Sequence, residues 1–198
     1  MKFTGILFLL LFACTNTETR TKKHPSGQLM YSKEYKDGSQ HGQSLYFAPN
    51  GDTVAMHNYV NGKQNGVQTI YIDYGTTTVQ KSIYFVVDDV RHGSDSSFYS
   101  NGQLSSVGQF QNGKQEGIWQ HYHEKGEFWF ESNWKNGNQE GPLNSFHPNG
   151  NKETECMIVG GKLEGTASFY DSTGTLTHQI IYEHSKPLDT IKNLANIR

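Results

Sequence analysis

The sequence is poor in the features that define several common classes of protein. Only 2 of its 198 residues are cysteines, so at most one intrachain disulfide can form. Its 17 basic and 19 acidic side chains give a net charge of −2, which leaves no basic footprint for nucleic acid and no polybasic patch for anionic lipid. Hydrophobic residues make up 34%, which is low for a globular core and normal for a sheet that buries one face through aromatic side chains.

Long apolar runs are also scarce. The run Phe3–Phe12, which follows Met1-Lys2, is too short to span a bilayer and is typical of a signal-peptide core. It ends in Leu11-Phe12-Ala13-Cys14, which resembles the cleavage box of bacterial lipoproteins. The resemblance implies that residues 1–13 are removed and that Cys14 is lipidated on its sulfur and its new amino group. An ordinary secretory signal, with Cys14 as a free thiol, is the alternative.

A lipidated Cys14 would anchor the protein to a membrane of the bacterial cell envelope, because two or more acyl chains hold a protein stably. Thr15 follows the cysteine, and by resemblance to enteric lipoproteins this favours the outer over the inner membrane. Residues 14–24 are polar and lack apolar periodicity, so they are interpreted as a flexible tether that holds the rest of the chain off the membrane.

Glycine is abundant, with 21 residues, and it recurs at a fixed period. One series has spacings of 24, 24, 27, 24, 24 and 24 residues: Gly27, Gly51, Gly75, Gly102, Gly126, Gly150 and Gly174. Two further glycines follow most of these, 11 and 15 residues later, as Gly113 and Gly117 do in the unit that opens at Gly102. Five residues after the last glycine of a unit comes an aromatic residue: Phe47, Tyr71, Phe98, Tyr122, Phe146 or Tyr170.

Each unit has the features of a β-hairpin. Asn-Gly pairs such as Asn112-Gly113 supply the two positive φ angles of a type I′ turn. Between turns the residues alternate with period two, so that Phe128, Phe130 and Trp134 share one face and Trp129 points away from the two phenylalanines. The third glycine of a unit is expected to form a bulge. The pattern predicts an all-β fold, an elongated antiparallel meander of about 13 strands built from 24-residue hairpins.

The repeat resembles the MORN-repeat family, and more closely its bacterial variant in the YwqK-type proteins, which are named as antitoxins. The matching pieces include Asn112-Gly113-Lys114, Gly117-Ile118-Trp119, and Phe146-His147-Pro148-Asn149-Gly150. The resemblance covers residues 25–184, as six full units and a partial seventh. It implies an open sheet with a binding or scaffolding role and no catalytic residues.

The C-terminal residues 185–198 are expected to lie outside the array, since Ser185 and Asp189 stand where the glycines of the next unit should be. After Pro187, apolar residues recur every third position, which fits a short amphipathic helix that caps the last strand. A disordered tail is the alternative. The hydrophobic positions of the pattern are Leu188, Ile191, Leu194 and Ile197.

Reactive chemistry finds little support. His121 and His123 share a strand face but lack a third ligand, and His147 lies two strands away, about 9.6 Å, which is too far to share one ion. Cys156 occupies a slot that holds Ser132 in the preceding unit, so it is interpreted as a small buried filler. No nucleophile elbow, phosphate loop or dinucleotide motif is present. We expect no cofactor, no metal and no small-molecule substrate.

Four residues are candidates for binding a partner. Trp129 and Trp119 belong to the aromatic set, and Trp129 is the stronger candidate because of the face on which it is predicted to lie. Asp88 and Asp89 replace the Asn-Gly turn in the third unit, whose hairpin from Val87 to Gly93 is expected to be longer than the others. A calcium site at these two aspartates would lack further oxygen ligands, so a solvated turn is favoured there.

Three functional hypotheses follow. The first is a non-enzymatic repeat lipoprotein of the cell envelope that acts as a protein-interaction or scaffold module. The second is a toxin-neutralising antitoxin or immunity protein, as the family's name suggests. The third is an envelope glycan-binding protein, for which the aromatic side chains would supply the binding face. In each case the protein partner or ligand is unknown.

Overall fold

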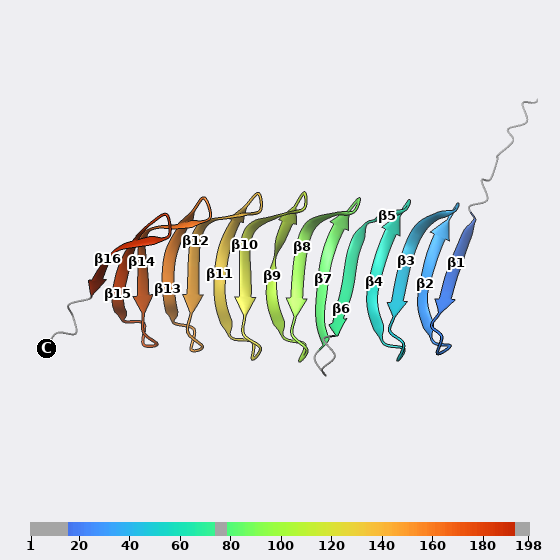
Figure 1. Cartoon of the computed structure of the whole chain (residues 1–198), viewed down its shortest axis with the longest axis horizontal. Coiled ribbons are helices and arrows are strands. Elements are labelled where there is room, and N and C mark those ends of the chain that lie inside the picture. The colour runs from blue at the N-terminus through green and yellow to red at the C-terminus, as the bar shows by residue number, and fades with distance from the viewer. Residues whose placement is uncertain (1–15, 74–78, 193–198) are drawn as a thin grey trace, which may run out of the picture.

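The computed structural model describes residues 16–73 and 79–192, and all its regular elements are β-strands. They form one antiparallel sheet of 16 strands, in which successive strands are neighbours and the short β5 pairs with β4 (Figure 1). The predicted all-β meander is therefore confirmed. The strands are β1 (Thr17–Lys23), β2 (Leu29–Lys36), β3 (Ser39–Phe47), β4 (Thr53–Val60), β5 (Lys63–Gln64), β6 (Gly66–Asp73), β7 (Val79–Val87), β8 (Val90–Phe98), β9 (Leu104–Gln111), β10 (Lys114–Tyr122), β11 (Phe128–Lys135), β12 (Asn138–Phe146), β13 (Lys152–Val159), β14 (Lys162–Tyr170), β15 (Leu176–Glu183) and β16 (Lys186–Lys192).

Along the upper edge in Figure 1, hairpins close through two consecutive residues with positive φ. At Asn112-Gly113 these angles are 51° and 78°, and Lys114 pairs directly with Gln111. This is the geometry of a type I′ turn, whose twist matches that of the flanking strands. The pairs recur at spacings of 24, 27, 24, 24, 24 and 24 residues: Asp37-Gly38, Asn61-Gly62, Asp88-Asp89, Asn112-Gly113, Asn136-Gly137, Gly160-Gly161 and His184-Ser185.

Each of these tight turns is hydrogen-bonded to the unit before it. The backbone N–H of Gly137 donates to the carbonyl oxygen of Gln115 at 2.9 Å, and the N–H of Asn136 donates to the Glu116 carboxylate at 2.8 Å. The backbone groups of the turns are thus satisfied by the neighbouring unit as well as by the strand ladder. The bond from the second turn residue recurs from Gly62 to Gln40, Asp89 to Gln64, Gly113 to Arg91, Gly161 to Gln139 and Ser185 to Leu163.

The lower edge carries wider turns. Between β10 and β11 the N–H of His123 donates to the carbonyl of Glu127 at 2.9 Å, and the N–H of Gly126, whose φ is +94°, donates back to His123 at 2.8 Å. The strand register shifts by one residue beside this turn. A second shift lies around Gly117, which has a φ of +73°, and the bulge predicted at the third glycine is confirmed there.

The sheet is a single layer, so its best-buried side chains form a row along its middle. Trp119 and Ala167 are 6% and 3% exposed and occupy equivalent positions 48 residues apart. Polar residues take the same slot in other units, because they find partners there. The fully buried Gln68 amide accepts from the N–H of Asn58 and donates to the carbonyls of Asn58 and Gly66.

Asp95 occupies this middle row in the unit that begins at Gly75. It is 5% exposed and pairs with the guanidinium of Arg91, which lies over the rings of Tyr84 and Phe110. Burial raises the pKa of the Asp95 carboxyl, and the nearby positive charge of Arg91 offsets only part of that effect.

The predicted flexible tether, residues 14–24, is wrong over most of its length. Thr17–Lys23 form β1, which pairs with β2 from Thr17↔Lys36 onward. Alternating threonines favour a strand, and the intervening charged residues suit an edge that must not recruit other chains. Arg20 adds a contact by placing its guanidinium 4.1 Å from the centre of the Tyr35 ring.

The C-terminal prediction is also wrong where the structure describes it. Lys186–Lys192 form β16 rather than a capping helix, and β16 pairs with β15 through the His184-Ser185 turn, with φ angles of 51° and 66°. The repeat therefore continues past residue 184 without its glycines. Leu188 and Ile191 remain 61% and 46% exposed, and residues 193–198 lie outside the described part. With β1, β16 and β5 added, the expected 13 strands become 16.

The three extra residues of the third unit lie at the other edge from the one predicted. Asp88-Asp89 is a two-residue turn like the rest, so the hairpin from Val87 to Gly93 is not longer. Instead β6 and β7 pair without a shift from Gly66↔Val86 to Asp73↔Val79, so this hairpin lacks the bulge of the other lower-edge hairpins. Loss of the bulge and longer strands absorb the insertion.

Asp95 gives the fold a testable dependence on pH. Its folded pKa is raised above the unfolded value, so its contribution to stability is present at low pH and is lost as pH rises through the folded pKa. The free energy of unfolding of wild type relative to Asp95→Asn should therefore fall between pH 4 and pH 7. The fall should be about 1.4 kcal/mol per unit of difference between the folded and unfolded pKa.

Urea unfolding at several pH values measures this difference. Asp189→Asn removes one negative charge at an exposed position of β16 and serves as the control for net charge. A wild type that gains stability relative to Asp95→Asn as pH rises would contradict the assignment, because it would mean that the ion pair with Arg91 outweighs burial.

Candidate interaction surface

Trp129 lies at the start of β11, where a bulge determines its direction. His121 pairs with Phe130 and Tyr122 pairs with Phe128, so Trp129 is the extra residue between two pairs. Its ring is 4.9 Å from that of Phe130, its neighbour in the chain. Adjacent residues of a regular strand point to opposite faces, so the prediction that Trp129 points away from Phe130 is wrong.

A shallow groove of about 320 Å³ adjoins this tryptophan. Apolar surface dominates its lining, and Trp129 itself is 43% exposed. A half-exposed tryptophan at an apolar depression is the kind of feature that anchors protein–protein contacts. We call this feature the Trp129 groove; its lining is Trp129, Phe130, Gln139, Leu143, Ser145 and Thr154.

A larger, polar hollow of about 720 Å³ lies on the other side of the tryptophan, among the lower-edge turns. His123 connects the two features, because it lines the hollow and its ring stacks on Trp129 with the centroids 5.0 Å apart. The Oε2 atom of Glu127 is buried and has no hydrogen-bond partner. We call this feature the Glu127 hollow; its polar lining is Asn101, Gln103, His123, Glu124, Lys125 and Glu127.

Trp119, the other tryptophan candidate, is not available to a partner. It is 6% exposed and lies across Gly108 on the neighbouring strand. Its indole N–H donates to the carbonyl of Gln109 at 3.3 Å. The signal for this burial is in the sequence, since only glycine at 108 leaves space for the indole ring.

Asp88 and Asp89 hold a turn rather than a ligand. The N–H of Gln64 donates to the Asp89 carboxylate at 2.8 Å, and the side-chain amide of Asn65 donates to Asp88 at 3.1 Å. Both aspartates therefore satisfy polar groups of the preceding unit, and their side chains serve the array.

The histidines have separate structural partners. His147 donates from its Nε2 to the carbonyl of Tyr170 at 2.9 Å, and His121 stacks on Phe130 with ring centroids 4.1 Å apart. Burial lowers the pKa of His121. Within residues 16–73 and 79–192, no cluster of three or more His, Cys, Asp or Glu side chains could hold a metal ion.

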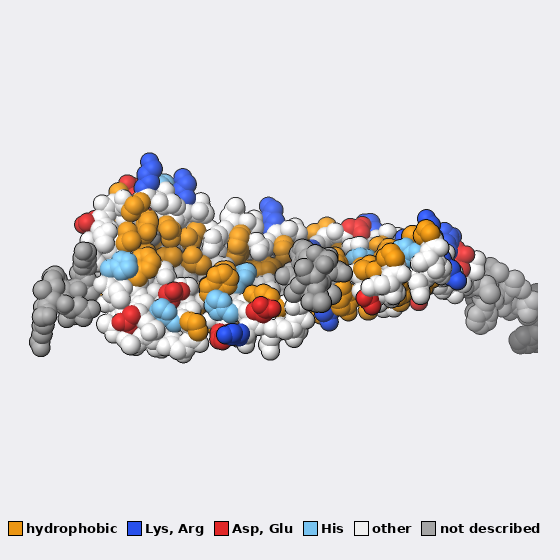
Figure 2. All heavy atoms as spheres, turned by 60° about the horizontal axis from the view of Figure 1, so that its bottom comes forward, with side chains coloured by type: hydrophobic (Ala, Val, Ile, Leu, Met, Phe, Trp, Pro, Cys, Tyr) orange, Lys and Arg blue, Asp and Glu red, His pale blue; other side chains and the backbone are white. Residues whose placement is uncertain are grey.

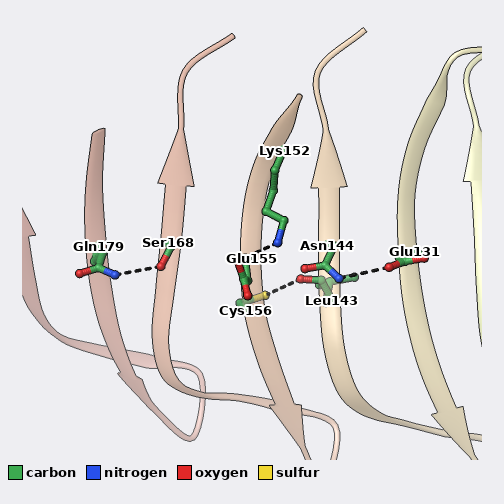
Figure 3. A network of polar contacts seen from close by, with 8 residues as sticks. All are labelled: Glu131, Leu143, Asn144, Lys152, Glu155, Cys156, Ser168 and Gln179. Carbon is green, nitrogen blue, oxygen red and sulfur yellow. Dashed lines mark hydrogen bonds and ion pairs between the residues drawn. The ribbon is translucent and has the colours of Figure 1, made fainter. Parts of the chain in front are cut away.

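Cys156 is buried, as predicted, with 7% of its surface exposed. Figure 3 shows its Sγ atom directed at the carbonyl of Leu143, 3.7 Å away on the adjacent strand. Burial raises the pKa of its thiol, which disfavours the reactive thiolate. The polar contacts drawn around it, such as Asn144 donating to Glu131 at 3.2 Å, join neighbouring strands and form no reactive cluster.

Cys14, the predicted lipidation site, lies outside the described residues, as do residues 1–13. In the part that the structure describes, no helix is long and apolar enough to cross a membrane. Figure 2 shows that hydrophobic side chains gather on one face over the C-terminal strands, at the left of the view.

Comparison with known families now adds to this geometry. Residues 91–112 and 115–136 each match the MORN repeat variant. No curated protein matches the chain. The first matched stretch contains most of the β8–β9 hairpin, and the second contains β10, β11 and Trp129. MORN repeats indicate a module for protein interaction and are generally non-enzymatic, and the Trp129 groove lies within this matched part of the chain.

The contact between Gly108 and Trp119 predicts a specific sensitivity. A Cβ atom at position 108 would lie 2.2 Å from the indole ring, so Gly108→Ala forces the buried tryptophan to move. We expect a loss of about 1–3 kcal/mol in the free energy of unfolding, measured by urea denaturation. Ser106→Ala on the same strand is the control, and equal effects of the two substitutions would show that Trp119 does not lie across Gly108.

Proposed function

We propose that this chain is a non-enzymatic protein-interaction module held in the bacterial cell envelope by lipid at Cys14, and that the Trp129 groove contacts its partner. The observation that carries the proposal is the position of Trp129. It is 43% exposed beside an apolar groove, within the stretch that matches a repeat generally used for interaction.

The physics of interfaces supports this choice of residue. Tryptophan is among the side chains most enriched at the energetic centres of interfaces, because a large ring loses little conformational entropy when it is covered. Trp129 is also held in place before any partner arrives, since it packs against the rings of His123 and Phe130. A pre-positioned anchor lowers the entropic cost of binding.

The fold also bears on how a lipid anchor would orient the protein. Strand β1 begins at Thr17, so two residues separate Cys14 from the sheet. A segment this short spans at most about 10 Å. An anchored molecule would therefore hold its β1 edge close to the membrane and extend its remaining strands away from it, with the Trp129 groove ten strands along.

The anchor is tested by membrane fractionation and intact mass on wild type and Cys14→Ala. We expect wild type in the membrane fraction with the mass of acyl chains and Cys14→Ala without that mass. A soluble wild type that retains residues 1–13 would contradict the envelope assignment and bring the antitoxin hypothesis forward.

The interaction is tested by crosslinking and capture from cells that express the full-length chain. We expect Trp129→Ala to reduce recovery of a specific protein partner at least tenfold, because the anchor of the interface is removed. Ile118→Ala, at a residue that is 54% exposed, is the matched control and should retain the partner. Equal recovery with both variants would contradict the role of Trp129, and capture of glycan alone would favour the glycan-binding alternative.

A further inference from the structure

We propose that Trp129 and the adjoining Glu127 hollow form a site for an arginine side chain of the partner. In this site the guanidinium group lies against the open indole face and pairs with the Glu127 carboxylate. The inference deepens the proposed function and rests on it, since it assigns the chemistry of the contact that the module makes.

The chain uses this arrangement twice within its own fold. Arg20 lies 4.1 Å from the centre of the Tyr35 ring and pairs with the carboxylate of Glu18. Arg91 lies 4.2 Å from the centre of the Tyr84 ring and pairs with Asp95. In both places an aromatic face and a carboxylate share one guanidinium, which satisfies the charge and the ring together.

At Trp129 the ring and the carboxylate are present without the cation. Glu127 precedes Trp129 by two residues, and both border His123: Glu127 lines the same hollow, and Trp129 stacks on the histidine ring. The Oε2 atom of Glu127 is buried and accepts no hydrogen bond. A buried carboxylate oxygen without a partner is unfavourable, so a cation that enters the hollow gains the full benefit of pairing with it.

The fold offers no internal cation that fills this role. Lys125 also lines the hollow, but among the ion pairs of the described residues none joins Lys125 to Glu127. Lys125 is exposed, which fits a solvated side chain at the turn. The cation must therefore come from another molecule.

A guanidinium fits the site better than an ammonium. It is planar, so it can stack on the indole while its N–H groups reach a carboxylate to one side. The hollow also presents the side-chain amides of Asn101 and Gln103, whose oxygens can accept the remaining N–H groups. An apolar residue beside the arginine would enter the Trp129 groove, which lies on the far side of the same ring.

The test is a titration of the full-length chain carrying Cys14→Ala with N-acetyl-arginine methylamide. N-acetyl-citrulline methylamide, which has nearly the same shape and no charge, is the control ligand. The readout is the NMR signal of the Trp129 indole N–H, assigned with Trp129→Phe. The indole N–H signals of Trp119 and Trp134, which are bonded inside the protein, report that the fold is intact.

We expect the Trp129 signal to shift saturably with the arginine probe and at least fivefold more weakly with citrulline. Glu127→Gln should remove the preference for arginine, while Glu124→Gln, at an exposed carboxylate of the same hollow, should keep it. Equal shifts with both probes, no shift at all, or an unchanged preference in Glu127→Gln would overturn the inference.

The two proposals fail separately. If a partner is captured through Trp129 but binds Glu127→Gln as well as wild type, the interaction module stands and the arginine site falls. If no partner is captured at all, the module falls, and the titration with the arginine probe still decides whether the site binds a guanidinium.

Discussion

The structure depends on one backbone constraint, the pair of consecutive positive φ angles at each tight turn. A turn of this kind needs no side chain to close the hairpin, and it sets the register of the two strands it joins. Because the turn N–H groups also bond to the preceding unit, as Gly137 does to Gln115, each hairpin is fixed against its neighbour. The array is therefore held mainly by nearest-neighbour contacts, as in other repeat proteins.

A single-layer sheet has no second layer to cover its apolar side chains, so they are buried within the layer. The middle row shows how this is done: Trp119 lies over Gly108, and Gln68 is buried with its amide satisfied. The same architecture leaves much surface open on both faces. An exposed ring such as Trp129 is consequently available for binding without any change in the fold.

The sequence predicts the period, the hairpins, the tight turns and the bulges well, because glycine and asparagine mark backbone conformations that few other residues adopt. It fails where the same conformation is reached by other residues. Asp88-Asp89 and His184-Ser185 adopt positive φ without glycine, so the longer hairpin and the end of the array were misplaced. Trp129 was assigned the wrong direction, because alternation with period two does not hold across a bulge. The burial of Trp119 depends on Gly108, which is close to it only across strands.

The central claim, that every unit is fixed to the preceding one through its tight turn, is tested most directly by amide hydrogen exchange at the turn residues. The most informative amide is that of Ser185, which donates to Leu163 and belongs to the unit that lacks glycines. The account predicts that Ser185 is protected from exchange to a similar degree as Gly137 and Gly113 in the middle of the array. Exchange of Ser185 at the rate of a free amide, with Gly137 protected, would show that the array ends before β16, and unprotected turns throughout would contradict the account as a whole.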